Sequence, residues 1–349
     1  MQRRTLLGRS AVLTAGLAAG LPLIIQETNA MTNTPQWDKT FPKSDRVDTR
    51  SVTFRTIYGT TVAADLYMPK NVAGPLPAVA VSGPFGAVKE QASGLYAQRL
   101  AEAGFLTIAF DPSHTGESTG EPRHVASPDM STEDFYAAVD FLSTLKDVDP
   151  NRIGILGICG FGGFAVNAAA GDPRIRATVA STMYDMCRVT ANGYFDAMDE
   201  KARKAARAAI ARQRTADAAS GTYAPQPGLP EKLTGGEPQF VQDYWHYYKT
   251  KRGFHPRSLN SNGNWIVSSF QSFMNAPLLT YAGEIESAVL IVHGEKAHSL
   301  YFGEAAFKRL KGDNKRLLIV PGASHTDLYD TDKIPFADII DFYAPALKA

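Results

Sequence analysis

The sequence is poor in cysteine, in net charge and in long apolar segments, and each shortage excludes a class of protein. Only two of its 349 residues are cysteines, Cys159 and Cys187, which excludes a disulfide framework. Its 36 Lys and Arg residues nearly balance 35 Asp and Glu residues, so the net charge of +1 gives no indication of a nucleic-acid or anionic-membrane partner. With 44% hydrophobic residues, the chain can build one large α/β domain or two smaller ones.

The most apolar stretch, roughly residues 11–25, lies in an N-terminal targeting segment. A charged start with adjacent arginines precedes it, and the small residues Thr28-Asn29-Ala30 follow it as a cleavage site. The opening order Arg-Arg-Thr-Leu-Leu resembles a twin-arginine signal, so we expect residues 1–30 to be removed and the mature chain to work in the periplasm or outside the cell. An uncleaved anchor is the alternative, although the run is short for a span, and we expect no stable membrane insertion of the mature chain.

Strands and helices are expected to alternate over most of the remaining chain. An extended lead-in over residues 31–50 precedes a hairpin over 51–68. Further strands are predicted at 77–82, 106–110, 153–158, 175–182, 288–293 and 316–320. Helices are predicted at 91–103, 131–145, 164–170, 301–310 and 335–347. This order implies a mostly parallel, twisted sheet with an antiparallel start and helices on both faces.

The alternation stops between residues 190 and 285, which we interpret as a helical cap inserted into a core formed by 51–189 and 286–349. The insertion holds an Ala- and Arg-rich helix over 199–220, a connector rich in Pro and Gly, and a cluster of aromatic residues. An aromatic lid would favour acyl or aromatic groups in a small-molecule substrate. The candidates for lining the substrate pocket are Tyr184, Tyr244, Trp245, Trp265 and His298.

A cysteine stands at the turn between a predicted buried strand and a helix. The apolar stretch 153–158 ends directly before Cys159, and the Gly-rich turn that starts at Gly160 leads into the next helix. Strand, sharp turn and helix form the outline of a nucleophile elbow, which places the thiol over a helix N-terminus that favours negative charge. A buried structural cysteine, or a disulfide between Cys159 and Cys187, is the alternative.

Two later loops carry the groups that a thiol nucleophile requires. His325 follows the last strand and is the expected general base, and Glu295 follows the strand after the cap and is the expected acid that orients it. Asp185, after the preceding strand, is the alternative acid. The carboxyl ends of parallel strands meet at one edge of the sheet, and the order nucleophile, acid, base is that of hydrolase triads built on such sheets.

Backbone N–H groups are expected to bind the oxyanion of the reaction. The N–H of Gly160 follows the nucleophile, and the N–H of Phe85 is the second expected donor because Pro84 has none. The spacing of the seven histidines indicates no metal site, and we expect the chemistry to need no cofactor.

These motifs resemble the α/β-hydrolase superfamily, and within it the dienelactone-hydrolase-like branch, whose nucleophile is cysteine. The resemblance covers most of residues 50–348 and rests on Gly157-Ile-Cys159-Gly160, on the loop from Asp111 to Ser118, and on Gly322-Ala-Ser-His325. The stretches His293–Ser299 and His325–Tyr329 look closer to exported bacterial hydrolases and fungal polyketide transferases. The resemblance implies the α/β-hydrolase fold.

One residue departs from the pattern of that family. Two positions after the nucleophile the family has a small residue, and this chain has Phe161. We expect the neighbouring Gly160, Gly162 and Gly163 to relieve the crowding.

We predict a hydrolase that cleaves a carboxylic ester, lactone or thioester through a thioester acyl-enzyme on Cys159. An acyltransferase with the same triad and a non-catalytic binding protein on the same fold are the alternatives. The stretch Gly160–Ala165 also matches the dinucleotide fingerprint, with Asp185 downstream. That interpretation leaves the loops of Glu295 and His325 without a role, and a dinucleotide-binding unit normally opens its domain, whereas four predicted strands precede this one.

Overall fold

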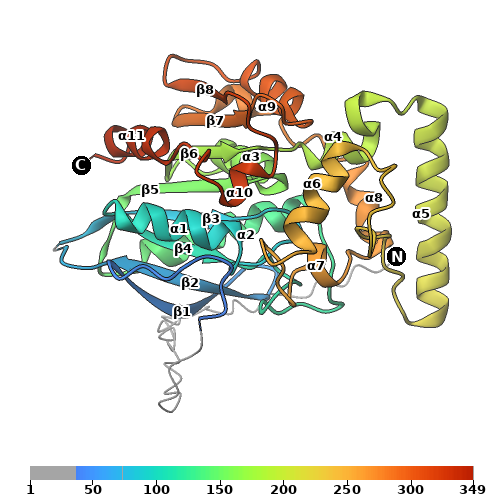
Figure 1. Cartoon of the computed structure of the whole chain (residues 1–349), viewed down its shortest axis with the longest axis horizontal. Coiled ribbons are helices and arrows are strands. Elements are labelled where there is room, and N and C mark those ends of the chain that lie inside the picture. The colour runs from blue at the N-terminus through green and yellow to red at the C-terminus, as the bar shows by residue number, and fades with distance from the viewer. Residues whose placement is uncertain (1–36, 73, 349) are drawn as a thin grey trace, which may run out of the picture. The chain divides into compact units, whose positions relative to one another are not determined.

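Eight strands form one mixed sheet in the order β1-β2-β4-β3-β5-β6-β7-β8 (Figure 1). The computed structural model describes residues 37–72 and 74–348, so the expected signal peptide lies outside the described residues. β1 (Val47–Arg55) and β4 (Leu106–Phe110) each pair antiparallel with β2 (Thr61–Pro69), and every other neighbouring pair is parallel. The remaining strands are β3 (Leu76–Ser82), β5 (Val148–Ile158), β6 (Ile175–Ser181), β7 (Ala288–Gly294) and β8 (Lys315–Val320).

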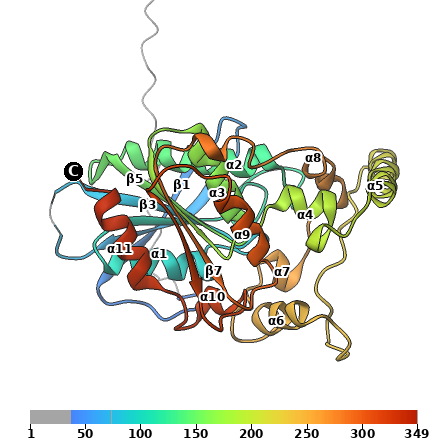
Figure 2. The same ribbon diagram turned by 90° about the horizontal axis from the view of Figure 1, so that it is seen from above.

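Helices cover both faces of the sheet (Figure 2). α1 (Ala92–Glu102) and α11 (Phe336–Ala346) lie on one face, and α2 (Pro128–Ser143) and α3 (Gly160–Gly171) lie on the other. Because both faces of the sheet are covered, central strands such as β4 and the end of β5 are buried throughout, whereas edge strand β1 has several exposed residues. The predicted fold class is therefore confirmed.

Some element boundaries differ from the predictions. β1 begins at Val47 rather than at residue 51. α2 begins at Pro128, three residues before the predicted start, because proline suits the first turn of a helix, where its missing N–H has no intrahelical partner. α3 begins directly after Cys159, so no loop separates the thiol from the helix N-terminus.

The chain between β6 and β7 is helical, and it includes the segment that the sequence assigns to a cap. Its helices are α4 (Met186–Asn192), α5 (Glu200–Ser220), α6 (Gln239–Tyr248), α7 (Leu259–Asn262) and α8 (Phe270–Phe273). α5 stands at the periphery in both ribbon views (Figures 1 and 2), where the Asp199 carboxylate caps its first turn and Gly221 ends it with a left-handed backbone. After β7 and β8 come α9 (Leu300–Phe307) and α10 (Asp327–Asp330).

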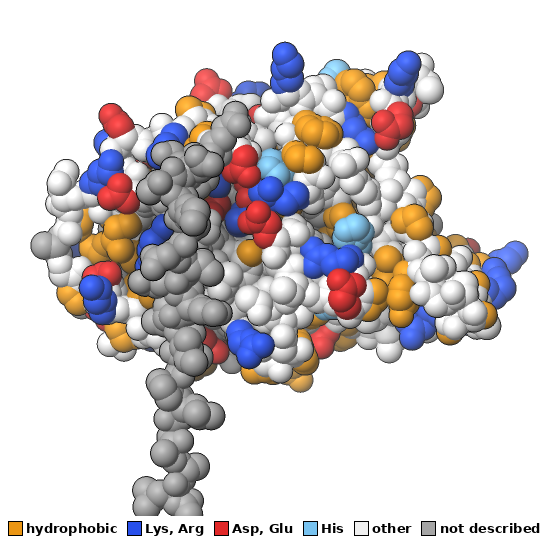
Figure 3. Space-filling model, turned by 90° about the horizontal axis from the view of Figure 1, so that it is seen from below, with side chains coloured by type: hydrophobic (Ala, Val, Ile, Leu, Met, Phe, Trp, Pro, Cys, Tyr) orange, Lys and Arg blue, Asp and Glu red, His pale blue; other side chains and the backbone are white. Residues whose placement is uncertain are grey.

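The surface agrees with the balanced charge of the sequence. Basic and acidic side chains are interspersed on the face shown in Figure 3. Within the described residues, no helix combines the length and apolar character needed to cross a membrane.

Candidate active site

Cys159 stands at the tip of a strained turn between β5 and α3. Its backbone has φ +57° and ψ −124°, a region that costs a residue other than glycine about 1–3 kcal/mol and that is concentrated at functional sites. Gly157 makes the turn possible, because a Cβ there would lie 2.1 Å from the carbonyl oxygen of Phe161. The local geometry is that of a nucleophile elbow.

Phe161 fits beside the elbow because its ring turns away into the core. It is fully buried and packs against Phe135 and Phe164, with ring centroids 6.0 and 5.3 Å away. Gly83, where a Cβ would come within 2.9 Å of the Phe161 Cβ, and Gly157 also leave space beside Phe161.

The Cys159 thiol is buried, and four neighbouring donor groups influence its pKa. Burial raises its pKa, and this effect is opposed by hydrogen bonds from the Tyr329 hydroxyl, the N–H groups of Gly160 and Phe85, and the Tyr244 hydroxyl. The structure thus brings both expected oxyanion donors to the sulfur. Cys187 is also buried and both thiols are free; burial raises the pKa of Cys187 to about 12.

The loop that carries the Phe85 N–H is held by the insertion. Asn260 on α7 donates from Nδ2 to the carbonyl of Phe85 at 2.8 Å and from its backbone N–H to the carbonyl of Gly86 at 3.2 Å. The Ser258 hydroxyl donates to the same Gly86 carbonyl at 3.0 Å. The indole of Trp265 stacks on the Phe85 ring with centroids 4.4 Å apart, so this predicted pocket residue supports the oxyanion loop.

His325 is buried, and among the described residues its ring hydrogen-bonds three hydroxyl groups. Its Nδ1 lies 2.6 Å from Ser299 Oγ and 2.9 Å from Thr182 Oγ1, and its Nε2 lies 2.9 Å from the Tyr329 hydroxyl. Burial, with repulsion from His298 and His293, holds the pKa of His325 well below its usual value, so the ring is neutral at pH 7.

Neither predicted acid lies at this imidazole. Glu295 is exposed, and its carboxylate accepts the N–H of Gly322 at 2.7 Å in the turn after β8. Asp185 accepts the N–H of Arg188 at 2.9 Å and caps α4. The expected carboxylate partner is therefore replaced by Ser299, from the same loop as Glu295, and Thr182, from the loop that holds Asp185.

Three of the predicted pocket residues, Tyr184, Tyr244 and His298, pack their rings against His325. The Tyr184 hydroxyl contacts the Tyr244 hydroxyl at 3.1 Å and hydrogen-bonds Nε2 of His298. The His298 ring lies 5.2 Å from the His325 ring, and burial lowers its pKa to about 4. Trp245 packs edge-on against its neighbour His246 instead.

Three residues of the site were not predicted: Thr182, Ser299 and Tyr329. Thr182 has φ +44°, which for a β-branched residue marks a strained position. Tyr329 follows His325 by four residues and Ser299 ends the loop of Glu295. Both residues lie in stretches that carry the family resemblance. A serine or tyrosine in such a stretch does not by itself indicate a partner of the histidine, so the sequence did not reveal their role.

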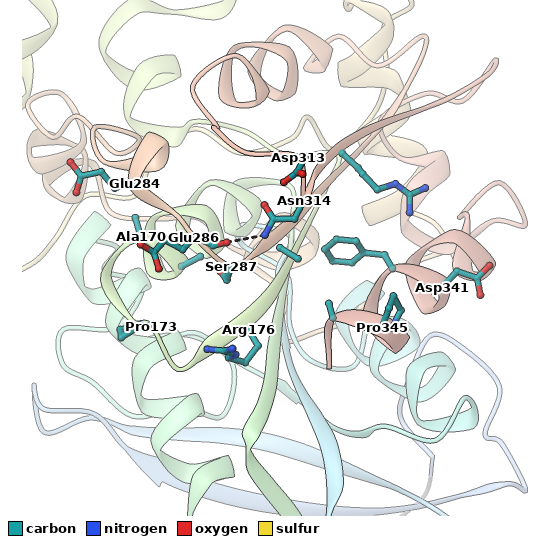
Figure 4. Close-up of a pocket in the computed structure, with 15 residues that line it drawn as sticks. Ala170, Pro173, Arg176, Glu284, Glu286, Ser287, Asp313, Asn314, Asp341 and Pro345 are labelled. Carbon is teal, nitrogen blue, oxygen red and sulfur yellow. Dashed lines mark hydrogen bonds between the residues drawn. The ribbon is translucent and has the colours of Figure 1, made fainter. Parts of the chain in front are cut away.

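A groove of about 750 Å³ lies at the opposite end of the sheet, where β6, β7 and β8 begin (Figure 4). Charged and polar side chains line much of it, including Arg176, Glu284, Asn314 and Asp341. None of the residues around Cys159 contributes to it, and ligands of such sheets bind at the carboxyl ends of strands.

Comparisons of the chain with known proteins identify its relatives. Residues 58–326 match the family described as X-Pro dipeptidyl-peptidase (S15 family). The uncharacterized protein PA2218 of Pseudomonas aeruginosa is 56% identical over 89% of this chain and 84% of its own length. The crystal structure of hypothetical protein PA2218 superposes with a TM-score of 0.87 and covers 90% of this chain and 98% of that chain.

More distant relatives carry names that describe acyl chemistry. The thiohydrolase aneE of Aspergillus aculeatus is 32% identical over 51% of this chain and 53% of its own length. The polyketide transferase claH of Penicillium crustosum is 31% identical over 37% of this chain and 42% of its own length. The α/β hydrolase GrgF from Penicillium sp. sh18 shares the fold, with a TM-score of 0.69 and 20% identity over 86% of this chain and 99% of that chain.

Proposed function

The chain belongs to the X-Pro dipeptidyl-peptidase (S15) family of α/β hydrolases, and we propose that it cleaves thioesters or esters through an acyl-enzyme on Cys159. The observation that carries this proposal is the thiol at a strained elbow, where the N–H groups of Gly160 and Phe85 both lower the pKa of the thiol. Donors placed in this way stabilise the negative charge that develops when a nucleophile adds to a carbonyl.

The proposed reaction has two stages. Cys159 Sγ attacks the acyl carbonyl, the oxyanion binds the N–H groups of Gly160 and Phe85, and the thiol proton ends on His325. Collapse of the tetrahedral intermediate returns this proton to the leaving group and leaves a thioester on Cys159. Water then attacks that thioester by the same route in reverse order.

The histidine favours a thioester over an amide substrate. An amine leaving group must be protonated by an imidazolium, which a carboxylate partner normally stabilises. His325 lacks such a partner and its pKa is held low by burial. A thiolate leaves more easily, because a thiol has a pKa of about 8.5 and needs less help from an acid. We therefore propose thioesters, and esters with good leaving groups, rather than the peptides of the family's description.

Acyl transfer to a bound acceptor is the second candidate. Cys159 is 7% exposed and His325 1% exposed, so little bulk water reaches the acyl-enzyme. A dry site favours an alcohol or amine that binds beside the thioester over hydrolysis. Relatives named thiohydrolase and polyketide transferase accord with either outcome.

The test is to trap the acyl-enzyme. We expect a short-chain thioester to add one acyl group to the wild-type chain and to Cys187→Ala, and none to Cys159→Ala, as measured by intact mass. Repeating the reaction with added alcohols and amines, and separating the free acid from the transfer product, decides between hydrolysis and transfer. Full turnover by Cys159→Ala would refute the thiol mechanism, and the absence of any adduct or turnover would favour a binding protein.

A further inference from the structure

We infer that Tyr329 is a catalytic residue whose hydroxyl carries the proton between Cys159 and His325. This inference rests on the proposed function, because it concerns the activation of the same thiol. Its basis is that the Tyr329 hydroxyl lies 2.9 Å from Nε2 of His325, and that the same hydroxyl lowers the pKa of the Cys159 thiol against the opposing effect of burial.

Among the described residues, the Tyr329 hydroxyl is the hydrogen-bond partner of Nε2 of His325, so a proton bound for this nitrogen meets Tyr329 first. After burial, Tyr329 is the largest influence on the pKa of the thiol, ahead of the N–H groups of Gly160 and Phe85 and the hydroxyl of Tyr244. The Tyr244 hydroxyl bonds Tyr184 rather than His325, so it offers no second path.

The tyrosine ring is firmly placed. Tyr329 is fully buried on α10, and the rings of Tyr247 and Tyr248 on α6 pack against it at 5.0 and 6.2 Å. Burial keeps the pKa of Tyr329 well above its usual value, so the phenol stays protonated and can donate as well as accept.

The hydroxyl network sets the direction of proton transfer. Thr182 Oγ1 donates to the carbonyl of His325 at 3.4 Å, which leaves its lone pairs free to accept a proton from Nδ1. We assign the proton of the neutral ring to Nδ1, which faces the oxygens of Ser299 at 2.6 Å and Thr182 at 2.9 Å, so that Nε2 presents its lone pair to Tyr329. The ground-state chain runs from the Cys159 S–H to the Tyr329 oxygen, and from the Tyr329 O–H to Nε2.

The transfer balances in both directions. As Sγ forms its bond to the acyl carbon, the S–H proton moves to the Tyr329 oxygen, the Tyr329 proton moves to Nε2 of His325, and the carbonyl electron pair becomes the oxyanion. When the intermediate collapses, the leaving group takes a proton from Tyr329, which regains one from Nε2. Tyrosine and histidine end the acylation step unchanged.

The test compares two matched Tyr→Phe variants by rapid-mixing acylation with a short-chain thioester. Tyr329→Phe keeps the ring and removes the bridging oxygen, so we expect acylation about 10²- to 10⁴-fold slower with little change in KM. Tyr247→Phe removes a buried hydroxyl from the ring packed on Tyr329, without contact to the sulfur, and we expect acylation within about threefold of wild type. Thermal melting of both variants reports whether the fold is kept.

A second measurement does not depend on any variant. In mixtures of H₂O and D₂O, the wild-type acylation rate is expected to follow a curved dependence that requires two transferred protons. A linear dependence, or a Tyr329→Phe variant that acylates within threefold of wild type, would overturn the relay. If wild type itself forms no adduct on Cys159, the proposed function fails; if wild type forms it and Tyr329→Phe forms it equally fast, only the relay fails.

Discussion

At the scale of single residues, hydroxyl groups take the place that a carboxylate was expected to fill. Ser299 and Thr182 bond Nδ1 of His325, and they orient the ring without adding a negative charge to a buried site. A carboxylate there would hold the imidazolium more strongly but would itself have to be desolvated. The arrangement suits a reaction in which the imidazolium exists only briefly.

The first prediction tests these hydroxyls against the exposed carboxylate. Thr182→Val and Ser299→Ala each remove a hydrogen bond that stabilises the imidazolium, so kcat should fall about 10- to 100-fold, since bonds to a charged group contribute about 1.5–3 kcal/mol. Glu295→Gln should stay within about threefold of wild type, because that side chain bonds only the Gly322 N–H. Steady-state thioester hydrolysis measures all three, and a large loss in Glu295→Gln alone would restore the carboxylate as the acid.

At the scale of elements, the insertion completes a site that the core alone does not hold. The nucleophile comes from the turn between β5 and α3, and the base comes from the loop after β8. The oxyanion loop after β3 is held by the insertion, through Asn260 on α7 and Trp265 after that helix. The core therefore supplies the loop that carries the Phe85 N–H, and the insertion holds that loop in position.

A second prediction follows for α7, whose two asparagines form a matched pair. Asn260→Ala leaves the carbonyl of Phe85 unpaired, so we expect kcat to fall about 10-fold and the free energy of unfolding to fall by about 1–2 kcal/mol. Asn262 lies two residues further and is exposed, and Asn262→Ala should change neither quantity appreciably. Thioester turnover and urea unfolding measure both effects. Equal kcat values in the two variants would show that α7 does not position the oxyanion loop.

At the scale of the whole molecule, buried charges link the loops that surround the site. Lys89, after β3, bonds Glu90 at 2.6 Å and Asp111, after β4, at 3.3 Å, and all three side chains are buried. Asp134 on α2 is also buried and accepts the N–H of Ser113 at 2.9 Å. Burial raises the pKa of Asp134 to about 7, so pH acts on the stability of the fold.

We predict that Asp134 makes the fold less stable as the pH rises. Because the folded pKa of Asp134 lies above the unfolded value of 3.8, the folded state binds its proton more tightly, and this stabilisation is lost as pH rises through 7. Between pH 5 and pH 8 wild type should lose about 2–3 kcal/mol relative to Asp134→Asn, which cannot ionise. Urea unfolding of both chains at each pH measures the difference, and parallel stability curves would contradict it.

Much of the site follows from short stretches of sequence. An apolar run, a cysteine, a glycine-rich turn and a helix specify the elbow at Cys159 almost locally, and Pro84 singles out the Phe85 N–H as a donor. The fold follows from the order of strands and helices, because right-handed crossovers leave few arrangements open. The twin-arginine-type signal over residues 1–30 is a property of sequence alone and stays a prediction.

The tertiary structure alone decided which oxygens meet His325. Glu295 and Ser299 lie four residues apart in one loop, and Thr182 and Asp185 lie three apart in another. From the sequence alone we expect a carboxylate as the partner of His325, because a carboxylate stabilises an imidazolium more strongly than a hydroxyl does. Thr182 is tied by its backbone N–H to the carbonyl of Val292 on β7, and Ser299 directly precedes α9, and both hydroxyls bond His325; Glu295 is exposed and Asp185 caps α4. The residue types in the sequence determine which chemistry is available. The direction in which those side chains point depends on contacts between segments far apart in the chain.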